Sequence, residues 1–350
     1  MPRTHRSTID EIGRSRTFHH HEHDRPPAAS VQPTMSAIAD DAAFAALTAT
    51  YRRELHVHSY RMLGNFEEAE DAVQETYLRA WRGRDSFDGS AALRAWLYRI
   101  ATNVCLDAIR RANRRPAGRS LDSIGEVPWI GPYPDRLLDE IAPPEDEPDT
   151  VAVQRETIEL AFLAAVQLLP PRQRAVLILR DVVEWSAKET AELLDMSVVA
   201  VNSALQRARA TMAANRPHGR TGAPPQRPTD AEMELVRRAI AAHEAANVEA
   251  MAAMLRDDVR IAMPPAPFWF NGKATFVPGL QAGLTDAGKW RLVPIEANRM
   301  PAMASYLLAP GDDTYRAFKI DVLRFEAGMV AEITTFSAGL FPEFGLPPTL

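Results

Sequence analysis

The sequence contains a single cysteine, Cys105, in 350 residues. One cysteine excludes an internal disulfide and fits a reducing compartment, so we expect a cytoplasmic protein. Cys105 lies among apolar residues at helical spacing, which favours a buried structural thiol over a nucleophile. No apolar run approaches the roughly 18 residues of a membrane-spanning helix, and the polar first residues lack the apolar stretch of a secretory signal. We therefore expect no membrane partner.

An excess of positive charge is also missing. The formal net charge is −6, which by itself argues against a nucleic-acid partner. The distribution of charge argues the opposite, because residues 82–119 carry nine arginines against three acidic residues and residues 198–220 carry four arginines and no acidic residue. Residues 120–160, between them, carry eleven acidic residues against two arginines. Two basic elements flank one acidic connector, and local patches decide nucleic-acid binding more than the total does.

Length and composition predict several domains, since 350 residues exceed one typical core and 46% apolar residues suffice for packed interiors. We divide the chain into a disordered N-terminal arm (1–38), a helical unit (39–115), an acidic proline-rich linker (116–150), a second helical unit (151–215), a flexible linker (216–228) and a C-terminal unit (229–350).

The arm contains His19, His20, His21 and His23. This cluster could bind a metal ion, but we favour an incidental solvated cluster and expect neither a metal site nor a cofactor. Met35 is followed closely by the first amphipathic pattern, so we expect translation to start there or the preceding residues to be dispensable.

Two helical patterns with apolar stripes occupy residues 71–81 and 91–115. In the first, the polar side carries Asp71, Gln74, Glu75 and Arg79. In the second, the face away from the apolar stripe carries Asn103, Asp107, Arg110, Arg111, Arg114 and Arg115. Asparagine and clustered arginines suit a phosphate backbone and exposed bases.

Residues 71–81 (DAVQETYLRAW) together with residues 95–111 (AWLYRIATNVCLDAIRR) resemble region 2 of the extracytoplasmic-function (ECF) sigma factors, the promoter-recognition subunits of bacterial RNA polymerase. The resemblance implies that Asp71, Gln74, Glu75 and Arg79 dock on the polymerase clamp helices. It also implies that residues 85–90 and the following helix capture an extruded base of the −10 element. In that pattern Asn103 and Asp107 contact base edges, and Arg110, Arg111, Arg114 and Arg115 contact phosphates.

The second helical unit carries the spacing of a helix-turn-helix. Residues 186–189 form a capping box that opens a helix over 187–194, and residues 195–197 form a tight turn whose Ser197 caps the next helix. The outward residues of that helix are Asn202, Ser203, Gln206, Arg207 and Arg209. This unit resembles ECF region 4, which implies that these residues and Ser197 read the −35 element in a major groove. Between the two units, the proline-rich acidic linker either threads the RNA exit path of the polymerase, as the family implies, or is a solvated spacer. Trp129 and Ile130 are expected to pack on some surface.

The C-terminal unit changes character. We expect one helix over 229–255, then β-strands near 259–263, 290–295, 302–309, 315–325 and 329–336, with a hairpin turn at 326–329. A leading helix and a curved antiparallel sheet resemble the SnoaL-like fold of ketosteroid isomerases and polyketide cyclases, which a branch of ECF sigma factors carries.

The fold supports a cone that could hold a small molecule, with candidate lining residues Met263, Trp269, Phe270, Trp290, Tyr306 and Phe318, although aromatic residues on strands are more often core. His243, Asp257, Asp258 and Asp321 form no recognisable acid/base pattern, so we expect no enzyme. A Gly-rich Asp-Gly-Gly-Gly motif that helps to couple the fused domain in one branch is missing, which leaves its mode of contact open.

The expected fold class is multidomain: two all-α sigma units followed by an α+β SnoaL-like cone. The expected function is an ECF sigma factor that binds core RNA polymerase and promoter DNA and is tuned by its C-terminal unit through an intramolecular contact. Two alternatives stay open. One is a bifunctional protein whose cone binds or turns over a small hydrophobic carbonyl compound, and the other is a stand-alone helix-turn-helix regulator that binds duplex DNA without polymerase.

Overall fold

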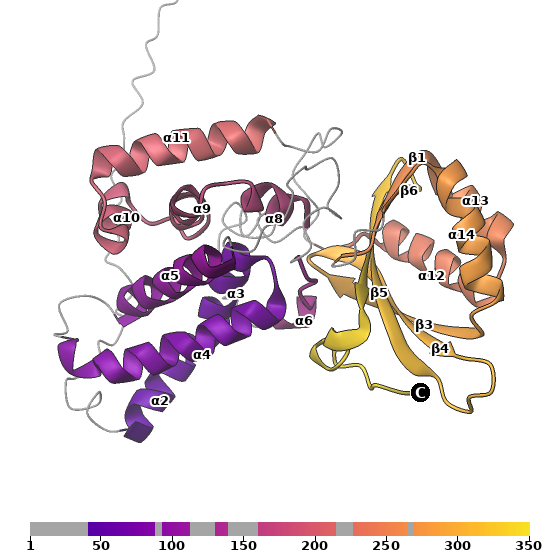
Figure 1. The fold of residues 1–350 in the computed structure, drawn as a ribbon, viewed down its shortest axis with the longest axis horizontal. Helices are drawn as coiled ribbons and strands as arrows, with labels where there is room; N and C mark the ends of the chain where they lie inside the picture. The colour runs from indigo at the N-terminus through magenta and orange to yellow at the C-terminus, as the bar shows by residue number, and fades with distance from the viewer. Residues whose placement is uncertain (1–40, 88–92, 113–129, 139–159, 215–226, 265–268) are drawn as a thin grey trace, which may run out of the picture.

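A computed structural model describes residues 41–87, 93–112, 130–138, 160–214, 227–264 and 269–350. Figure 1 shows two groups of elements, with the helices α2 to α11 on one side and a sheet with the helices α12 to α14 on the other. The short helix α6 (Asp135–Leu138) lies between them. This is the expected class of two helical units followed by an α+β unit. Among the described residues, no helix has the length and apolar character to cross a membrane.

The first helical unit is a small bundle. Its elements are α2 (Asp41–Ala49), α3 (Arg52–Leu63), α4 (Phe66–Gly83), the 3-10 turn η1 (Arg84–Ser86) and α5 (Leu93–Ala112). The first amphipathic pattern after Met35 does not form one helix, because the chain breaks before Arg52 and forms two. Gly64 ends α3 at a φ of 81°, a conformation that glycine adopts without strain. Asn65 then caps α4 by accepting a hydrogen bond from the Glu68 N–H at 3.1 Å.

The second helical unit packs directly on the first. It consists of α8 (Leu160–Gln167), α9 (Pro171–Leu177), the π-helical turn η3 (Ile178–Val182), α10 (Ala187–Leu194) and α11 (Val198–Ala214). One hydrophobic cluster contains buried residues of both units. The rings of Tyr98 in α5 and Trp185 before α10 lie 5.2 Å apart, and Arg174 in α9 donates a hydrogen bond to the Met62 carbonyl of α3 at 2.7 Å. The two units therefore share one core.

The C-terminal unit is a six-stranded sheet with helices on one face. Its strands are β1 (Leu255–Ala262), β2 (Trp269–Asn271), β3 (Lys289–Ala297), β4 (Met300–Leu308), β5 (Arg316–Glu326) and β6 (Met329–Ser337), in the spatial order β2-β1-β6-β5-β4-β3. Its helices are α12 (Asp230–Glu244), α13 (Val248–Met254) and α14 (Lys273–Thr285). Strands β1 and β6 run parallel and all other pairs run antiparallel. The sheet is therefore mixed, where an antiparallel one was expected.

Three local features of this unit differ from the sequence prediction. The helix expected over 229–255 is divided, because Ala246 takes a φ of 49° and the Asn247 side chain caps a new helix by accepting from the Ala250 N–H at 2.9 Å. Strand β2 and helix α14 were not expected at all. Helix α14 contains Pro278 and two glycines, which are weak helix formers, so its sequence carries no clear helical signal.

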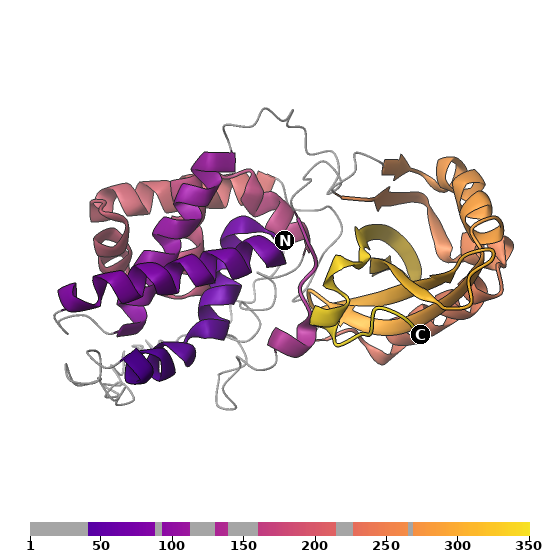
Figure 2. The ribbon, with the colours of Figure 1, turned by 60° about the horizontal axis from the view of Figure 1, so that its bottom comes forward.

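The two faces of the sheet have different neighbours. One face packs under α12, α13 and α14 around a cluster of apolar residues that includes Leu292, Met303 and Leu323. The other face packs against residues 130–138 and the C-terminal turns η4 (Ala338–Leu340) and η5 (Pro342–Phe344), through Ile320, Val322 and Phe341 among others. Figure 2 shows the C-terminal turns on the side of the sheet away from α12. This second face is the one that connects the C-terminal unit to the helical units.

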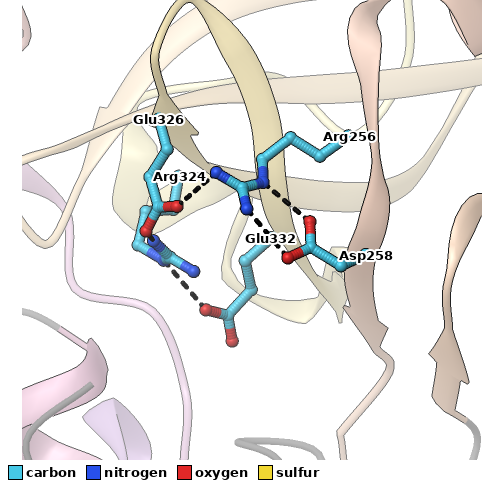
Figure 3. Close-up of polar contacts among 5 residues, drawn as sticks. All are labelled: Arg256, Asp258, Arg324, Glu326 and Glu332. Atoms are coloured by element: carbon cyan, nitrogen blue, oxygen red, sulfur yellow. Dashed lines mark hydrogen bonds and ion pairs between the residues drawn. The ribbon is translucent and has the colours of Figure 1, made fainter. Parts of the chain in front are cut away.

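Charged side chains occupy another part of the second face. Arg256 forms two hydrogen bonds to Asp258 (2.7 and 2.8 Å) and one to Glu326 at 2.8 Å, so it joins β1 to β5. Arg324 pairs with Glu326 and, at 3.0 Å, with Glu332 of β6. Figure 3 shows the five side chains as one chain of alternating charge. The network links the three strands β1, β5 and β6.

Candidate nucleic-acid interface

Helices α4 and α5 place the two predicted polar faces side by side. On α4, Asp71 and Gln74 are exposed, and Glu75 and Arg79 are partly exposed and joined to each other by a hydrogen bond of 2.7 Å. These four residues follow one face because they recur at intervals of three or four positions, while Val73 and Ala80 on the other face are buried. The face predicted to dock on polymerase is therefore accessible in this arrangement.

Asp107 on α5 joins that face to the predicted −10 surface. Its carboxylate accepts a hydrogen bond from Arg79 Nη1 of α4 at 3.1 Å and another from Arg110 Nη1 at 2.8 Å. The Asp107 backbone carbonyl also accepts a hydrogen bond from Arg111 at 3.3 Å. The pKa of Arg79 is raised, first by its hydrogen bond to Glu75 and then by the one to Asp107. Asp107 thus holds two arginines, one from each predicted site.

The remainder of α5 divides cleanly into an exposed and a buried side. Asn103, Arg110 and Arg111 are exposed, whereas Cys105 is fully buried, and burial raises the pKa of its thiol to about 12. Cys105 is therefore the structural thiol that the sequence predicted. Arg114 and Arg115, the last two predicted phosphate contacts, lie outside the described residues, as do residues 88–90 of the predicted base-capturing loop.

The helix-turn-helix is built by the local signals that predicted it. Ser186 and Glu189 form the capping box, with hydrogen bonds of 3.1 Å and 2.7 Å between side chain and backbone. Asp195 ends α10 in the left-handed conformation, at a φ of 52°. Ser197 then accepts a hydrogen bond from the Ala200 N–H at 3.1 Å and caps α11. These caps end α10 and begin α11 within three residues.

Helix α11 presents its predicted reading face outward. Val201, Ala204, Leu205 and Ala208 are buried against α9 and α10. The opposite side carries the predicted −35 contacts, of which Ser203 is half-buried and the others are exposed: Ser197, Asn202, Gln206, Arg207 and Arg209. Arg209 differs from the others, because it pairs with both carboxylate oxygens of Asp181 at 2.9 and 2.7 Å. A bidentate pair of this kind orients the guanidinium and partly neutralises it.

A third site, which sequence reasoning missed, joins the first helical unit, the linker and the C-terminal unit. The hydroxyl of Tyr60 in α3 donates to the Gly131 carbonyl of the linker at 2.6 Å and accepts from Asn298 Nδ2 at 2.7 Å. Asn298 also accepts from the Tyr133 N–H at 2.8 Å, and its own N–H donates to the Tyr133 carbonyl at 2.9 Å. Tyr60, Tyr133 and Asn298 are all 0% exposed. We call this group of residues the junction.

Two residues of the β3–β4 turn contact the linker. Asn298 and Arg299 both take positive φ values, 57° and 58°, as a two-residue hairpin turn requires. Beside Asn298, the Arg299 N–H donates to Asp135 Oδ1 at 2.8 Å, and the Arg299 side chain lies 3.9 Å from the other carboxylate oxygen. Tyr133 of the linker also contacts α3, because its hydroxyl lies 3.0 Å from His56 Nδ1. Ile130, predicted to pack on some surface, is buried here, and Trp129 lies outside the described residues.

The candidate cone residues do not form one pocket lining. Trp290 and Phe318 meet on the helix-covered face, with ring centroids 5.3 Å apart, and Phe270 contacts Phe276 at 5.5 Å. Met263 is partly buried at the edge of that face. Tyr306 points to the other face, where its hydroxyl donates to the Pro347 carbonyl at 2.9 Å. The Trp269 side chain lies outside the described part of the structure.

Comparison with known proteins agrees with the order of these units. Two family models match, Sigma-70 region 2 over residues 47–115 and Sigma-70 region 4 over residues 159–212. The ECF RNA polymerase sigma factor SigG of Mycobacterium tuberculosis is 42% identical over 323 residues, which cover 88% of this chain and 85% of that protein. SigW of Bacillus subtilis is 34% identical over 170 residues, covering 49% of this chain and 87% of that protein.

Among solved structures, the crystal structure of the extracytoplasmic-function sigma factor SigJ of Mycobacterium tuberculosis is similar to this one. The TM-score is 0.54 at 23% sequence identity, and the match covers 87% of this chain and 99% of that chain. At this identity the likeness concerns the fold alone. It extends over the C-terminal unit as well as the helical units, because a match to the helical units by themselves would cover far less of this chain.

Proposed function

Because this chain belongs to the ECF RNA polymerase sigma factors, we propose that its C-terminal unit controls whether the two helical units can spread along a promoter. Membership of the family means that the protein binds core RNA polymerase and directs transcription initiation at specific promoters. Family membership does not determine the role of each residue or of the C-terminal unit.

The observation that carries the proposal is the junction. Residues 131–135 are held on one side by Tyr60 and on the other by Asn298 and Arg299, through buried hydrogen bonds of 2.6 to 2.9 Å. The two helical units meanwhile share one hydrophobic cluster. Binding two separated promoter elements requires this shared core to open and the linker between the units to move. A C-terminal unit that pins the linker to α3 therefore favours the closed arrangement.

We assign the polymerase-binding face to Asp71, Gln74, Glu75 and Arg79, and the −10 surface to α5 with Asn103, Arg110 and Arg111. The support is their accessibility on adjacent helices. Asp107 has a different role in this proposal from the base contact implied by the family pattern, because its carboxylate already holds Arg79 and Arg110. The −35 contacts are assigned to the outward side of α11.

We assign no catalysis to the C-terminal unit. Two of its described carboxylates are buried. Glu332 pairs with Arg324 at 3.0 Å, and Asp321 has both oxygens engaged, one by Thr335 Oγ1 at 2.5 Å and the other by Lys319 Nζ at 2.8 Å. Both oxygens are therefore committed to contacts within the sheet. This arrangement supports a regulatory unit rather than the proton transfer that a carbonyl-converting enzyme would need.

Run-off transcription with core polymerase tests the proposal. Three proteins are compared: the full chain, a truncation after Asn215, and the full chain with Asn298→Ala, which breaks the junction without removing any element. Asn271→Ala is the matched control, because Asn271 is an exposed asparagine of the same sheet that lies outside the junction.

The proposal expects more transcript from Asn298→Ala than from the full chain and from Asn271→Ala. Equal transcript from all four proteins would refute control by the C-terminal unit and leave the sigma activity intact. Promoter binding by the chain without polymerase, with no transcript in its presence, would instead favour a stand-alone helix-turn-helix regulator.

A further inference from the structure

Helix α11 begins with two exposed valines. Among the residues that the structure describes, Val199 is the most exposed large hydrophobic side chain, at 75%, and Val198 beside it is 43% exposed. Neither valine belongs to a hydrophobic cluster of the described residues. Valine is a weak helix former, and the first turn of a helix more often carries acidic residues, so local helix stability does not account for the pair. Single exposed valines are common on protein surfaces, and the position on the helix therefore decides what these two do.

Val199 lies in the middle of the outward side of α11. Asn202, Ser203 and Gln206 follow it by three, four and seven positions, so they share its side of the helix. The opposite side carries the buried residues Val201, Ala204, Leu205 and Ala208. Val198 lies about 100° from Val199 around the helix axis, on the flank of the helix. Val199 is therefore an apolar member of the face predicted to read the −35 element, and the one nearest the start of the helix.

The turn before α11 holds Val199 in a defined position. Ser197 accepts hydrogen bonds from the N–H groups of two residues that follow it, with its side chain from Ala200 at 3.1 Å and with its carbonyl from Val201 at 3.0 Å. These bonds enclose Val199 in a closed first turn. The valine side chain branches at Cβ, so it has few rotamers in a helix. A rigid apolar group loses little conformational entropy when it binds a partner.

The charge around Val199 favours DNA as that partner. The first turn of α11 contains no acidic residue, and residues 198–220 carry four arginines and no acidic residue, so a duplex can approach without repulsion. Residues at the N-terminal end of the second helix of a helix-turn-helix contact base edges in the major groove. The apolar group on those edges is the C5 methyl group of thymine. A rigid valine at this position matches it in chemistry.

We propose that Val199 reads a thymine of the −35 element by packing its methyl groups against the thymine C5 methyl group in the major groove. This proposal rests on the assignment of the outward side of α11 to the −35 element and adds a residue that determines sequence preference there. Asn202 lies one turn further along the same side of the helix and meets a neighbouring base pair.

Selection of −35 sequences by holoenzyme, formed from the full chain and core polymerase, tests the proposal. A duplex library randomised over the −35 positions is bound, and each selected thymine is then replaced by deoxyuridine, which lacks only the methyl group. The test variant is Val199→Ala, which shortens an exposed side chain and favours the helix. Val198→Ala is the matched control, because it makes the same change at the adjacent residue on the flank of the helix.

We expect the unaltered holoenzyme to select thymine at one −35 position. Deoxyuridine at that position should weaken its binding about fourfold, the contribution of one buried methyl group. In Val199→Ala the preference for thymine should relax, and deoxyuridine should weaken binding by at most about twofold, because the two methyl contacts are coupled. Val198→Ala should retain the pattern of the unaltered chain.

An equal effect of deoxyuridine on the unaltered chain and on Val199→Ala overturns the proposal, as does the absence of a selected thymine. Weaker binding of Val199→Ala to core polymerase, with unchanged base preference, also overturns it and assigns the valine to a protein contact. Gln206→Ala separates these failures from a failure of the −35 assignment. A changed preference in Gln206→Ala alone would mean that α11 reads the −35 element without Val199, whereas no change in either variant would refute the assignment of α11 itself.

Discussion

The hydroxyl of Tyr60 accepts a hydrogen bond from Asn298 across 238 residues of sequence, at 2.7 Å, with both side chains fully buried. The same hydroxyl donates to Gly131. One atom of the first helical unit is therefore bonded to both the linker and the C-terminal unit. The closed arrangement depends on a few polar groups that have no access to water.

A double-mutant cycle between Tyr60 and Asn298 should show strong coupling. Asn298→Ala leaves the Tyr133 N–H and one side of the Tyr60 hydroxyl without partners, so we expect a loss of about 1–3 kcal/mol in the first urea-unfolding transition. Tyr60→Phe should cost a similar amount. The double variant should lose less than the sum, by at least about 0.5 kcal/mol, because the two changes remove a shared interaction. Additive losses would mean that the two side chains do not meet in solution.

The buried histidines of α3 should make stability depend on pH. Burial lowers the pKa of His56 to about 4 and that of His58 to about 3, against 6.5 for an exposed histidine. The unfolded chain therefore takes up protons that the folded chain excludes. Stability is full above pH 6.5 and falls as the pH drops toward 4, by roughly 1.4 kcal/mol per histidine and pH unit once below 6.5.

Melting curves between pH 7.5 and 5 measure this dependence. His58→Asn, which retains a polar group opposite Thr102, should flatten the fall because one of the titrating groups is gone. An unchanged slope in His58→Asn would show that His58 does not contribute. This window covers the ordinary pKa of an exposed histidine, so it measures the histidine contribution directly.

Asp107→Asn should affect promoter binding more than stability. The pairs of Asp107 with Arg79 and Arg110 are partly exposed, and such pairs contribute at most about 1 kcal/mol. Without the negative charge, Arg110 is free to contact phosphate, so promoter affinity of the holoenzyme should rise and its salt dependence should steepen. Asp230→Asn, at the exposed start of α12, is the control. A loss of promoter binding with altered base preference at −10 would instead make Asp107 a base-reading residue.

The sequence predicted what is local. The capping box at Ser186 involves residues three positions apart, and it is present with both hydrogen bonds. The β5–β6 hairpin turn was also found, because Ala327 and Gly328 carry positive φ values in a turn with clear flanking strands. The residues that form such features are close together in the sequence, so a short segment is enough to recognise them.

The junction could not be predicted in this way. Asn298 occupies a hairpin turn for which asparagine is suited, but nothing local says that its amide will meet Tyr60 and Tyr133. The parallel pairing of β1 with β6 was missed for the same reason, since 70 or more residues separate the partners. Of the candidate pocket residues, Tyr306 and Trp290 lie on adjacent strands, but strand alternation sends their side chains to opposite faces.

Two arginines on the predicted reading face of α11 should behave differently when replaced. Arg207 is exposed and Arg209 is bound to Asp181 by two hydrogen bonds. Arg207→Ala should therefore lower promoter affinity. If Arg207 reads a base, we expect a loss of about 1–3 kcal/mol and a relaxed preference at one −35 position. If it contacts phosphate, we expect the slope of affinity against salt concentration to fall by about one. Arg209→Ala should lower Tm slightly and leave base preference unchanged, because its guanidinium is already committed to Asp181.

Binding of holoenzyme to a −35 sequence library at two salt concentrations separates these outcomes, with Arg237→Ala on α12 as the control for loss of one exposed arginine. Equal effects of Arg207→Ala and Arg209→Ala on base preference would show that the pair with Asp181 opens when α11 enters the groove.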